Sequence, residues 1–197
     1  MRDLQLFLLC YAFIILQRMI ELFIARKNEK WMKKQGAVEF GQKHYRYIVV
    51  MHILFFIVLL GEKIFRNQSI SLMWPWLAIA FILTQLIRVW AISSLGKYWN
   101  TKIIVLPNAT IIRSGPYSFI RHPNYTVVSL ELLIIPLLFN AYFTAVMFTF
   151  FNIIVLLIRI PEEEQALITL TEYKEKFAGC NRFLPKIIDK STINKDD

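Results

Sequence analysis

Five long apolar segments alternate with polar segments along the chain. They fall at about Leu4–Ile24, Tyr47–Leu60, Leu72–Leu95, Tyr125–Phe139 and Tyr142–Ile160. A helix needs roughly 20 apolar residues to cross a bilayer, with about 17 as the lower limit, so the second and fourth segments are short. The last two segments are separated only by Asn140 and Ala141. The pattern predicts an all-α integral membrane protein of about five transmembrane helices, of which the last two form a tight helical hairpin.

The composition is that of one membrane domain. The 197 residues are 56% hydrophobic, and their mean hydropathy is +0.47, whereas soluble domains are about 45–50% apolar. No small-residue cleavage site follows the first apolar segment, which argues against a removed signal peptide. We therefore expect a single domain over residues 1–197, with only the polar tail Ser191–Asp197 frayed.

The basic residues predict how the helices are oriented. The net charge is +9, and 18 of the 23 Lys and Arg residues lie in segments that five spans would place on one side of the membrane. Three lie on the opposite side, and Arg18 and Arg88 fall within spans. Cytoplasmic loops are enriched in Lys and Arg, so this asymmetry predicts an outside N-terminus and a cytoplasmic C-terminus. Topology then accounts for the positive charge, and nucleic acid is not expected as a partner.

The charges within the apolar segments need partners. Arg18 and Glu21 are three residues apart, so on a helix they would pair with each other or with Gln17. Arg88 needs a carboxylate, a carbonyl or the interface, and the sequence does not identify its partner. Structural neutralisation is the preferred role for all three. The aromatic residues expected to anchor the protein at the membrane interface are Trp74, Trp76, Trp99 and Tyr142.

Two polar clusters at the ends of apolar segments predict a pocket at the membrane surface. The first is the stretch 115–125, which reads Gly-Pro-Tyr-Ser-Phe-Ile-Arg-His-Pro-Asn-Tyr. The second begins at Arg159 and includes the three glutamates 162–164. Arg159 and Glu163 are four residues apart, which places them on one helix face. A cation and an anion at one pocket mouth could bind opposite ends of a zwitterionic ligand.

Each cluster also has an ordinary structural interpretation. His122, Pro123 and Asn124 suit the start of a helix, and the glutamates would be favourable at the start of a cytoplasmic helix, near its positive dipole end. The spacing of His44, His52 and His122 does not place two ligands on one helix face, so no metal site is expected. The glycines are never closer than five residues apart, so there is no Gly-x-Gly-x-x-Gly loop and no P-loop. Any adenosine cofactor must therefore be bound by a different architecture from that of soluble nucleotide-binding domains.

Taken together, these motifs resemble the isoprenylcysteine carboxyl methyltransferase family. The matching features are the Gly-Pro-Tyr from Gly115, the Arg-His-Pro-x-Tyr from Arg121, the Arg159–Glu163 spacing, Leu167, Tyr173 and the Arg-Phe-Leu-Pro from Arg182. The resemblance covers about half of the chain, from Leu95 to Pro185. Its Arg-His-Pro and Glu-Glu parts also occur in membrane phospholipid N-methyltransferases and sterol reductases.

The resemblance implies a membrane enzyme that uses S-adenosylmethionine to methylate an acidic oxygen on a lipid-like substrate. It implies that Arg159 is the catalytic residue near the reacting group. It also implies a cytoplasmic cofactor pocket formed by Ala109, Thr110, Ile111, Ile112, Tyr117, His122, Pro123, Asn124, Tyr125 and Glu163. The expected partners are a lipophilic small molecule and membrane lipid, and no metal is required.

Departures from the family pattern bear on the substrate. The family commonly has a glycine where this chain has Val127, and the family's Phe-Gly before the final tyrosines is missing. These departures weaken the case for a prenylated protein C-terminus as substrate. The variant is similar to bacterial members that O-methylate alkylpyrones or alkylresorcinols, which implies a location in a bacterial cell membrane. The alternatives are prenylcysteine carboxyl methylation, phospholipid N-methylation, nicotinamide-dependent reduction and a non-enzymatic membrane scaffold.

Overall fold

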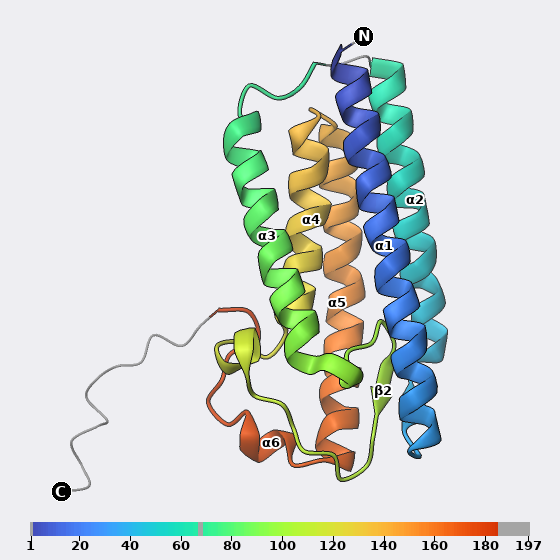
Figure 1. Ribbon diagram of the computed structural model, residues 1–197, viewed down its shortest axis with the longest axis vertical. Helices are drawn as coiled ribbons and strands as arrows, with labels where there is room; N and C mark the ends of the chain where they lie inside the picture. The colour runs from blue at the N-terminus through green and yellow to red at the C-terminus, as the bar shows by residue number, and fades with distance from the viewer. Residues whose placement is uncertain (1, 67–68, 185–197) are drawn as a thin grey trace, which may run out of the picture.

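The computed structural model describes residues 2–66 and 69–184, which form a bundle of long helices (Figure 1). The long helices are α1 (Arg2–Lys34), α2 (Gln42–Arg66), α3 (Trp74–Leu95), α4 (Pro123–Leu138) and α5 (Tyr142–Leu170). The short elements are β1 (Val38–Phe40), η1 (Gly96–Tyr98), β2 (Ile103–Val105), η2 (Gly115–Ser118) and α6 (Tyr173–Lys176). The end of the bundle that carries these short elements, at the bottom of Figure 1, is termed the loop end. The tail Ser191–Asp197 lies outside the described residues.

Four helices, α1, α2, α3 and α5, are long and apolar enough to span a membrane. The expectation of a helical integral membrane protein is therefore confirmed. Helix α4 is apolar but has 16 residues, or about 24 Å of helix, which is less than the roughly 30 Å of a hydrocarbon core. Helices α4 and α5 pack side by side and are joined by a short turn at Asn140, so the predicted hairpin is present. Asn140 has a φ of 57°, a conformation that asparagine adopts more readily than most residues.

Helix α1 continues well past the apolar segment that predicted it. It ends at Lys34 rather than near Ile24, so a polar stretch forms its last turns. Asn28 attaches this extension to the loop end, because its Nδ2 donates to the carbonyls of Gly96 (3.0 Å) and Trp99 (2.8 Å). The helix is thus extended by tertiary hydrogen bonds that hydropathy does not register.

Helix α5 also continues beyond its apolar segment, to Leu170 rather than Ile160. The three glutamates therefore lie along an unbroken helix and do not begin a separate one. The last turns of α5 remain attached to the loop end because Ala166 packs against Ile103 and Val105 of β2. This extension carries the polar side chains of α5 to the position where the loops converge.

Strands β1 and β2 form a two-stranded antiparallel sheet that the hydrophobic pattern did not predict. Glu39 and Ile104 are the central pair of the register. Lys102, just before β2, donates to Glu29 of α1 (2.8 Å) and lies 3.2 Å from Glu39. Burial lowers the pKa of Lys102, but its hydrogen bonds to Glu29 and Glu39 outweigh burial and raise the pKa above its ordinary value. The sheet and this charged group fasten the segment after α3 to the end of α1.

Four charged side chains from three helices neutralise one another inside the bundle. Hydrogen bonds run from both Arg18 and Arg88 to both Glu21 and Glu131. The predicted Arg18–Glu21 pair is confirmed at 2.8 Å, and the partners of Arg88 are identified as Glu21 and Glu131. Two positive and two negative charges balance, which lowers the cost of holding them in an apolar environment.

We expect Glu131→Gln to lower the free energy of unfolding by about 1–3 kcal/mol. Glutamine preserves the size of the side chain, but Arg18 and Arg88 must then share one carboxylate. The unfolding transition of the detergent-solubilised protein measures this loss. Glu175→Gln, at an exposed position of α6, is the control. An unchanged transition in Glu131→Gln would show that the charged group does not stabilise the bundle.

Candidate functional site

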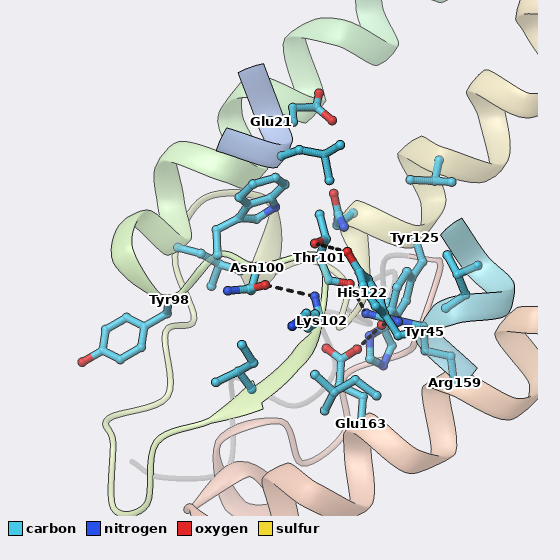
Figure 2. Close-up of a pocket in the computed structure, with 18 of the residues that line it drawn as sticks. Glu21, Tyr45, Tyr98, Asn100, Thr101, Lys102, His122, Tyr125, Arg159 and Glu163 are labelled. Carbon is cyan, nitrogen blue, oxygen red and sulfur yellow. Dashed lines mark hydrogen bonds between the residues drawn. The ribbon is translucent and has the colours of Figure 1, made fainter. Parts of the chain in front are cut away.

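A cavity of about 750 Å³ lies among the five long helices and the loop end. This volume is within the range of about 300–1,000 Å³ that is typical of ligand pockets. Figure 2 shows Tyr45, His122, Tyr125, Arg159 and Glu163 gathered at the loop end of the cavity, with Glu21 farther toward the middle of the bundle. The inner half of the cavity is lined mostly by apolar side chains, including Ile15, Leu22, Ile48, Phe56, Val128 and Val155. One cavity thus joins a polar region to an apolar region.

The structure places nearly all of the predicted site residues around this cavity. Its lining includes Arg159, Ala109, Thr110, Ile111, Ile112, Tyr117, His122, Asn124, Tyr125 and Glu163. Pro123 is the exception and does not line the cavity. It is the first residue of α4, and its side chain is fully buried. The fixed φ of proline suits the first turn of a helix, where the missing N–H leaves no bond unmade.

Among the described residues, Arg159 and Glu163 form no direct ion pair and are linked through Tyr125. Arg159 Nε donates to the Tyr125 hydroxyl (2.7 Å), which in turn donates to Glu163 Oε2. Arg159 Nη2 donates to the carbonyl of Thr101 (2.5 Å), and its Nη1 has no hydrogen-bond partner within residues 2–66 and 69–184. The guanidinium is therefore fixed from two sides and keeps donor capacity for an anion in the cavity.

Tyr45 and Thr101, which no sequence motif marks, complete the hydrogen-bonded group around Arg159. The Tyr45 hydroxyl on α2 lies 3.1 Å from Thr101 Oγ1. Thr101 lies two residues before β2, so the strand pairing helps to position it. Tyr45 lies outside the half of the chain that resembles the family, and only the packing of α2 against α5 brings it to the site.

Glu164, which the sequence pattern did not single out, holds the His122 loop against α5. His122 Nε2 lies 3.1 Å from Glu164 Oε1, and Arg182 donates to both Glu164 oxygens (3.0 and 2.5 Å). The His122 ring also stacks on Tyr125, with ring centres 5.3 Å apart. His122 is thus a buried residue at a helix start and a residue that lines the cavity, so both interpretations of it apply.

The three successive glutamates have three different environments. Glu162 is partly exposed, lies 2.9 Å from His44 Nδ1 and does not line the cavity. Glu163 lines the cavity, whereas Glu164 is committed to His122 and the C-terminal segment. Glu162 is consequently a natural control position for substitutions of Glu163.

Four buried polar atoms of cavity-lining residues have no partner within the described residues. They are Arg88 Nε, Trp99 Nε1, Asn124 Oδ1 and the Tyr173 hydroxyl, of which the last two lie at the loop end. Leaving such an atom unpaired costs about 1–3 kcal/mol, so a polar ligand that supplied a partner would be favoured. Burial, and then the charges of Glu164 and Glu163, raise the pKa of Tyr173. Burial and Glu163 likewise raise the pKa of Tyr117, so both phenols stay neutral and can donate hydrogen bonds at physiological pH.

Glu164→Gln is expected to speed amide hydrogen exchange at Arg121 and His122 roughly tenfold. The amides of these two residues donate to the carbonyls of the segment 181–182 (3.0 and 3.1 Å), and the charge of Glu164 holds that segment in place. Exchange followed by mass spectrometry measures the change, with Glu162→Gln as the control. Unchanged exchange at Arg121 and His122 would mean that Glu164 does not anchor the loop.

Comparison with known proteins identifies the family of this chain. The model of the isoprenylcysteine carboxyl methyltransferase family matches residues 76–169, which include most of α3, all of α4 and nearly all of α5. The Bacillus subtilis protein YpbQ, described as uncharacterized, is 48% identical over 162 residues, which are 82% of this chain and 96% of that protein. A Haemophilus influenzae protein, also described as uncharacterized, is 29% identical over 159 residues, or 80% of this chain and 92% of that protein. This chain belongs to the isoprenylcysteine carboxyl methyltransferase family, a family of membrane methyltransferases that use S-adenosylmethionine.

Proposed function

We propose that this protein transfers a methyl group from S-adenosylmethionine to an acidic oxygen of a lipophilic substrate. The observation that carries the proposal is one cavity in which an arginine with an unused donor adjoins a long apolar region. Arg159 can bind an anion, and the apolar inner half can hold a hydrocarbon chain. Membership of the family supplies the class of cofactor.

The residues at the loop end suit S-adenosylmethionine, which combines an adenosine with a sulfonium, an ammonium and a carboxylate. Glu163 can accept hydrogen bonds from the ammonium or from ribose hydroxyls. The aromatic faces of Tyr117 and Tyr125 can pack on adenine or contact the sulfonium through cation–π attraction. The unpaired oxygens of Asn124 and Tyr173 offer further polar contacts. When bound, the cofactor supplies a methyl group on a positively charged sulfur.

The remaining predicted residues would shape the wall of the cofactor site. The stretch 109–112 lines the cavity between β2 and η2 and would contribute mainly through its backbone. The His122 ring would contribute its face, because its Nε2 is engaged by Glu164. Pro123 would act by starting α4, so that Asn124 and Tyr125 are presented from the first turn.

Arg159 would bind and orient the anionic oxygen that receives the methyl group. Its guanidinium is already fixed by Tyr125 and Thr101, so it loses little freedom when the anion binds. Orientation of two reactants can contribute roughly 7–11 kcal/mol to lowering a barrier. An oxygen that is already ionised has no proton to lose, so the site needs no general base. A bidentate contact would hold the oxygen without covalent chemistry from the protein.

The favoured substrate is an alkylpyrone-type polyketide lipid. Its ring hydroxyl is an acidic enol, which suits a site with an arginine and no required base, and its tail would occupy the inner half of the cavity. A prenylcysteine carboxylate meets the same charge requirement and is the alternative. Phospholipid N-methylation suits the site less well, because an amine would have to lie near Arg159 and release a proton.

We further propose five membrane spans, with the N-terminus outside and the loop end in the cytoplasm of a bacterial cell. The asymmetry of basic residues supports this orientation, and α4 would cross together with its hairpin partner α5. A soluble cofactor would then reach the loop end directly. A cysteine placed at Asn140, in a background without Cys10 and Cys180, should react with an impermeant maleimide in intact cells. Reaction only after lysis would reverse the orientation.

The function is tested by transfer of labelled methyl groups from S-adenosylmethionine to three acceptors. These are a long-chain alkylpyrone, N-acetyl-farnesylcysteine and phosphatidylethanolamine, each offered to the purified protein in lipid nanodiscs. We expect label in the alkylpyrone. Label in farnesylcysteine alone would retain O-methylation but replace the favoured substrate. Label in phosphatidylethanolamine alone would overturn the proposal of an acidic oxygen.

A further inference from the structure

We propose that the inner half of the cavity contains a second polar recognition site, formed by His52 of α2 and Asn152 of α5. This site binds a hydroxyl group on the hydrocarbon part of the substrate, about 10 Å from the oxygen held by Arg159. The inference rests on the proposed function only in assigning the acidic end of the substrate to Arg159. The substrate would then be an acidic lipid that carries a hydroxyl group within its hydrocarbon tail.

The helices place His52 and Asn152 at the same depth in the bundle. His52 is seven residues after Tyr45 on α2, and Asn152 is seven residues before Arg159 on α5. Seven residues make about two turns, so each pair shares a helix face and is separated by about 10 Å along the axis. Helices α2 and α5 pack against each other in opposite directions (Figure 1). Going from Tyr45 to His52 along α2, or from Arg159 back to Asn152 along α5, therefore leads away from the loop end. Both His52 and Asn152 line the cavity.

The hydrogen bonding of His52 makes Nε2 an acceptor. His52 Nδ1 lies 2.8 Å from the carbonyl oxygen of Ile48. A carbonyl oxygen only accepts hydrogen bonds, so Nδ1 carries the proton. In the neutral ring Nε2 is then unprotonated, and it has no partner within the described residues. His52 thus brings a hydrogen-bond acceptor to the inner half of the cavity, whose wall is mostly apolar.

The orientation of the Asn152 amide follows from Ser129. Ser129 Oγ donates its proton to the carbonyl of Tyr125 (2.9 Å), so toward Asn152 it can only accept. The group 2.8 Å away must therefore be Asn152 Nδ2, which leaves Oδ1 as the free end of the amide. Asn152 is only 3% exposed, and its Oδ1 has no partner among the described residues. Asn152 lines the cavity, and its Oδ1 is not among the enclosed unpaired atoms, so this acceptor is open to a ligand that brings a donor.

The surroundings favour a hydroxyl over a charged donor. Arg18, Glu21 and Arg88 also line the inner half, but their charges are balanced within the group that includes Glu131. Because the described residues place no unbalanced carboxylate there, an ammonium group would remain uncompensated. A neutral hydroxyl can donate to His52 or Asn152 without carrying charge into the membrane. His52 and Asn152 therefore favour a neutral hydroxyl over an ammonium group, and their depth in the bundle sets where on the tail that hydroxyl must lie.

The test compares two acids that differ by one hydroxyl, stearate and 10-hydroxystearate. Their affinities for the cofactor-free protein in lipid nanodiscs are measured by calorimetry. We expect the wild-type protein to bind 10-hydroxystearate about tenfold more tightly than stearate, as one buried hydrogen bond allows. 3-Hydroxystearate, whose hydroxyl lies close to the carboxylate, should show no such preference, because it does not reach the second site.

Substitutions in the cavity distinguish hydroxyl binding by His52 and Asn152 from anion binding by Arg159. His52→Phe and Asn152→Leu are expected to remove most of the preference while binding stearate as the wild type does. His52→Gln, which keeps an acceptor, should retain part of it. His44→Phe is the matched control, because His44 is on the same helix but does not line the cavity. Arg159→Ala should weaken the binding of both acids equally and leave their ratio unchanged.

Each outcome bears on the inference. Equal affinities of the wild type for stearate and 10-hydroxystearate would overturn it and would leave water as the occupant of the second site. Binding of neither acid, or a preference that survives both His52→Phe and Asn152→Leu, would also overturn it. A titration of the same samples with S-adenosylmethionine tests the proposed function separately, because the two acids are compared without cofactor.

Discussion

Arg159→Ala is expected to lower kcat/KM for methyl transfer by about 10²–10³-fold, comparable to the loss of a preorganised donor in other enzymes. The affinity for S-adenosylmethionine should stay close to that of the wild type. Arg159 is the cavity residue whose guanidinium is held by Tyr125 and Thr101, and without it the anionic oxygen of the substrate lacks a fixed partner. The rate with saturating cofactor and the calorimetric affinity separate the two effects.

Two further variants make this result specific. Arg113→Ala removes an arginine that is also at the loop end but donates to the Lys176 carbonyl (2.9 Å) and does not line the cavity, so activity should persist. Arg159→Lys keeps the charge but loses the forked contacts, so its rate should be intermediate. Wild-type turnover by Arg159→Ala would show that Arg159 does not position the substrate.

Glu163→Gln is expected to weaken S-adenosylmethionine binding by about tenfold to a hundredfold. A hydrogen bond to a charged group contributes about 1.5–3 kcal/mol, and about 1.4 kcal/mol corresponds to tenfold in affinity. Glutamine is the same size and can still accept the hydrogen bond that Tyr125 donates, so the site should remain assembled. The variant therefore removes the charge offered to the cofactor and little else, and calorimetry measures the loss.

Glu162→Gln is the matched control for this prediction. Glu162 precedes Glu163 on the same helix, but it interacts with His44 and does not line the cavity. Its affinity for the cofactor should match that of the wild type. Equal affinities for the Glu163→Gln and Glu162→Gln variants would exclude the carboxylate of Glu163 from cofactor binding.

The helices could be predicted from the sequence, but the features that attach the loop end to them could not. Long apolar segments reveal membrane helices because a helix satisfies its backbone hydrogen bonds within the segment itself, away from water. Strands β1 and β2 have three residues each and pair across more than 60 positions, which leaves no local pattern. Trp76 is 71% exposed, in line with its expected place facing lipid, whereas Trp99 is 2% exposed and lines the cavity. An aromatic residue at the end of an apolar segment has the same sequence context in both cases.

The same distinction applies to the site. Arg159 and Glu163 could be placed together because four residues return to one face of a helix. Their connection through Tyr125 depends on how α4 packs against α5. Likewise, Glu131 is 43 residues from Arg88, and only the packing of α3 against α4 makes them partners. Spacing within one helix could be predicted, and contacts between helices required the fold.

The central claim is that the loop end of the cavity binds S-adenosylmethionine. A calorimetric titration of the folded protein in nanodiscs, with NADPH titrated in parallel, tests this claim most directly. We expect saturable binding of S-adenosylmethionine at one site per chain and none of NADPH. Binding of NADPH alone would contradict the claim and indicate a reductase. Binding of neither by the folded protein would contradict it in favour of a membrane scaffold.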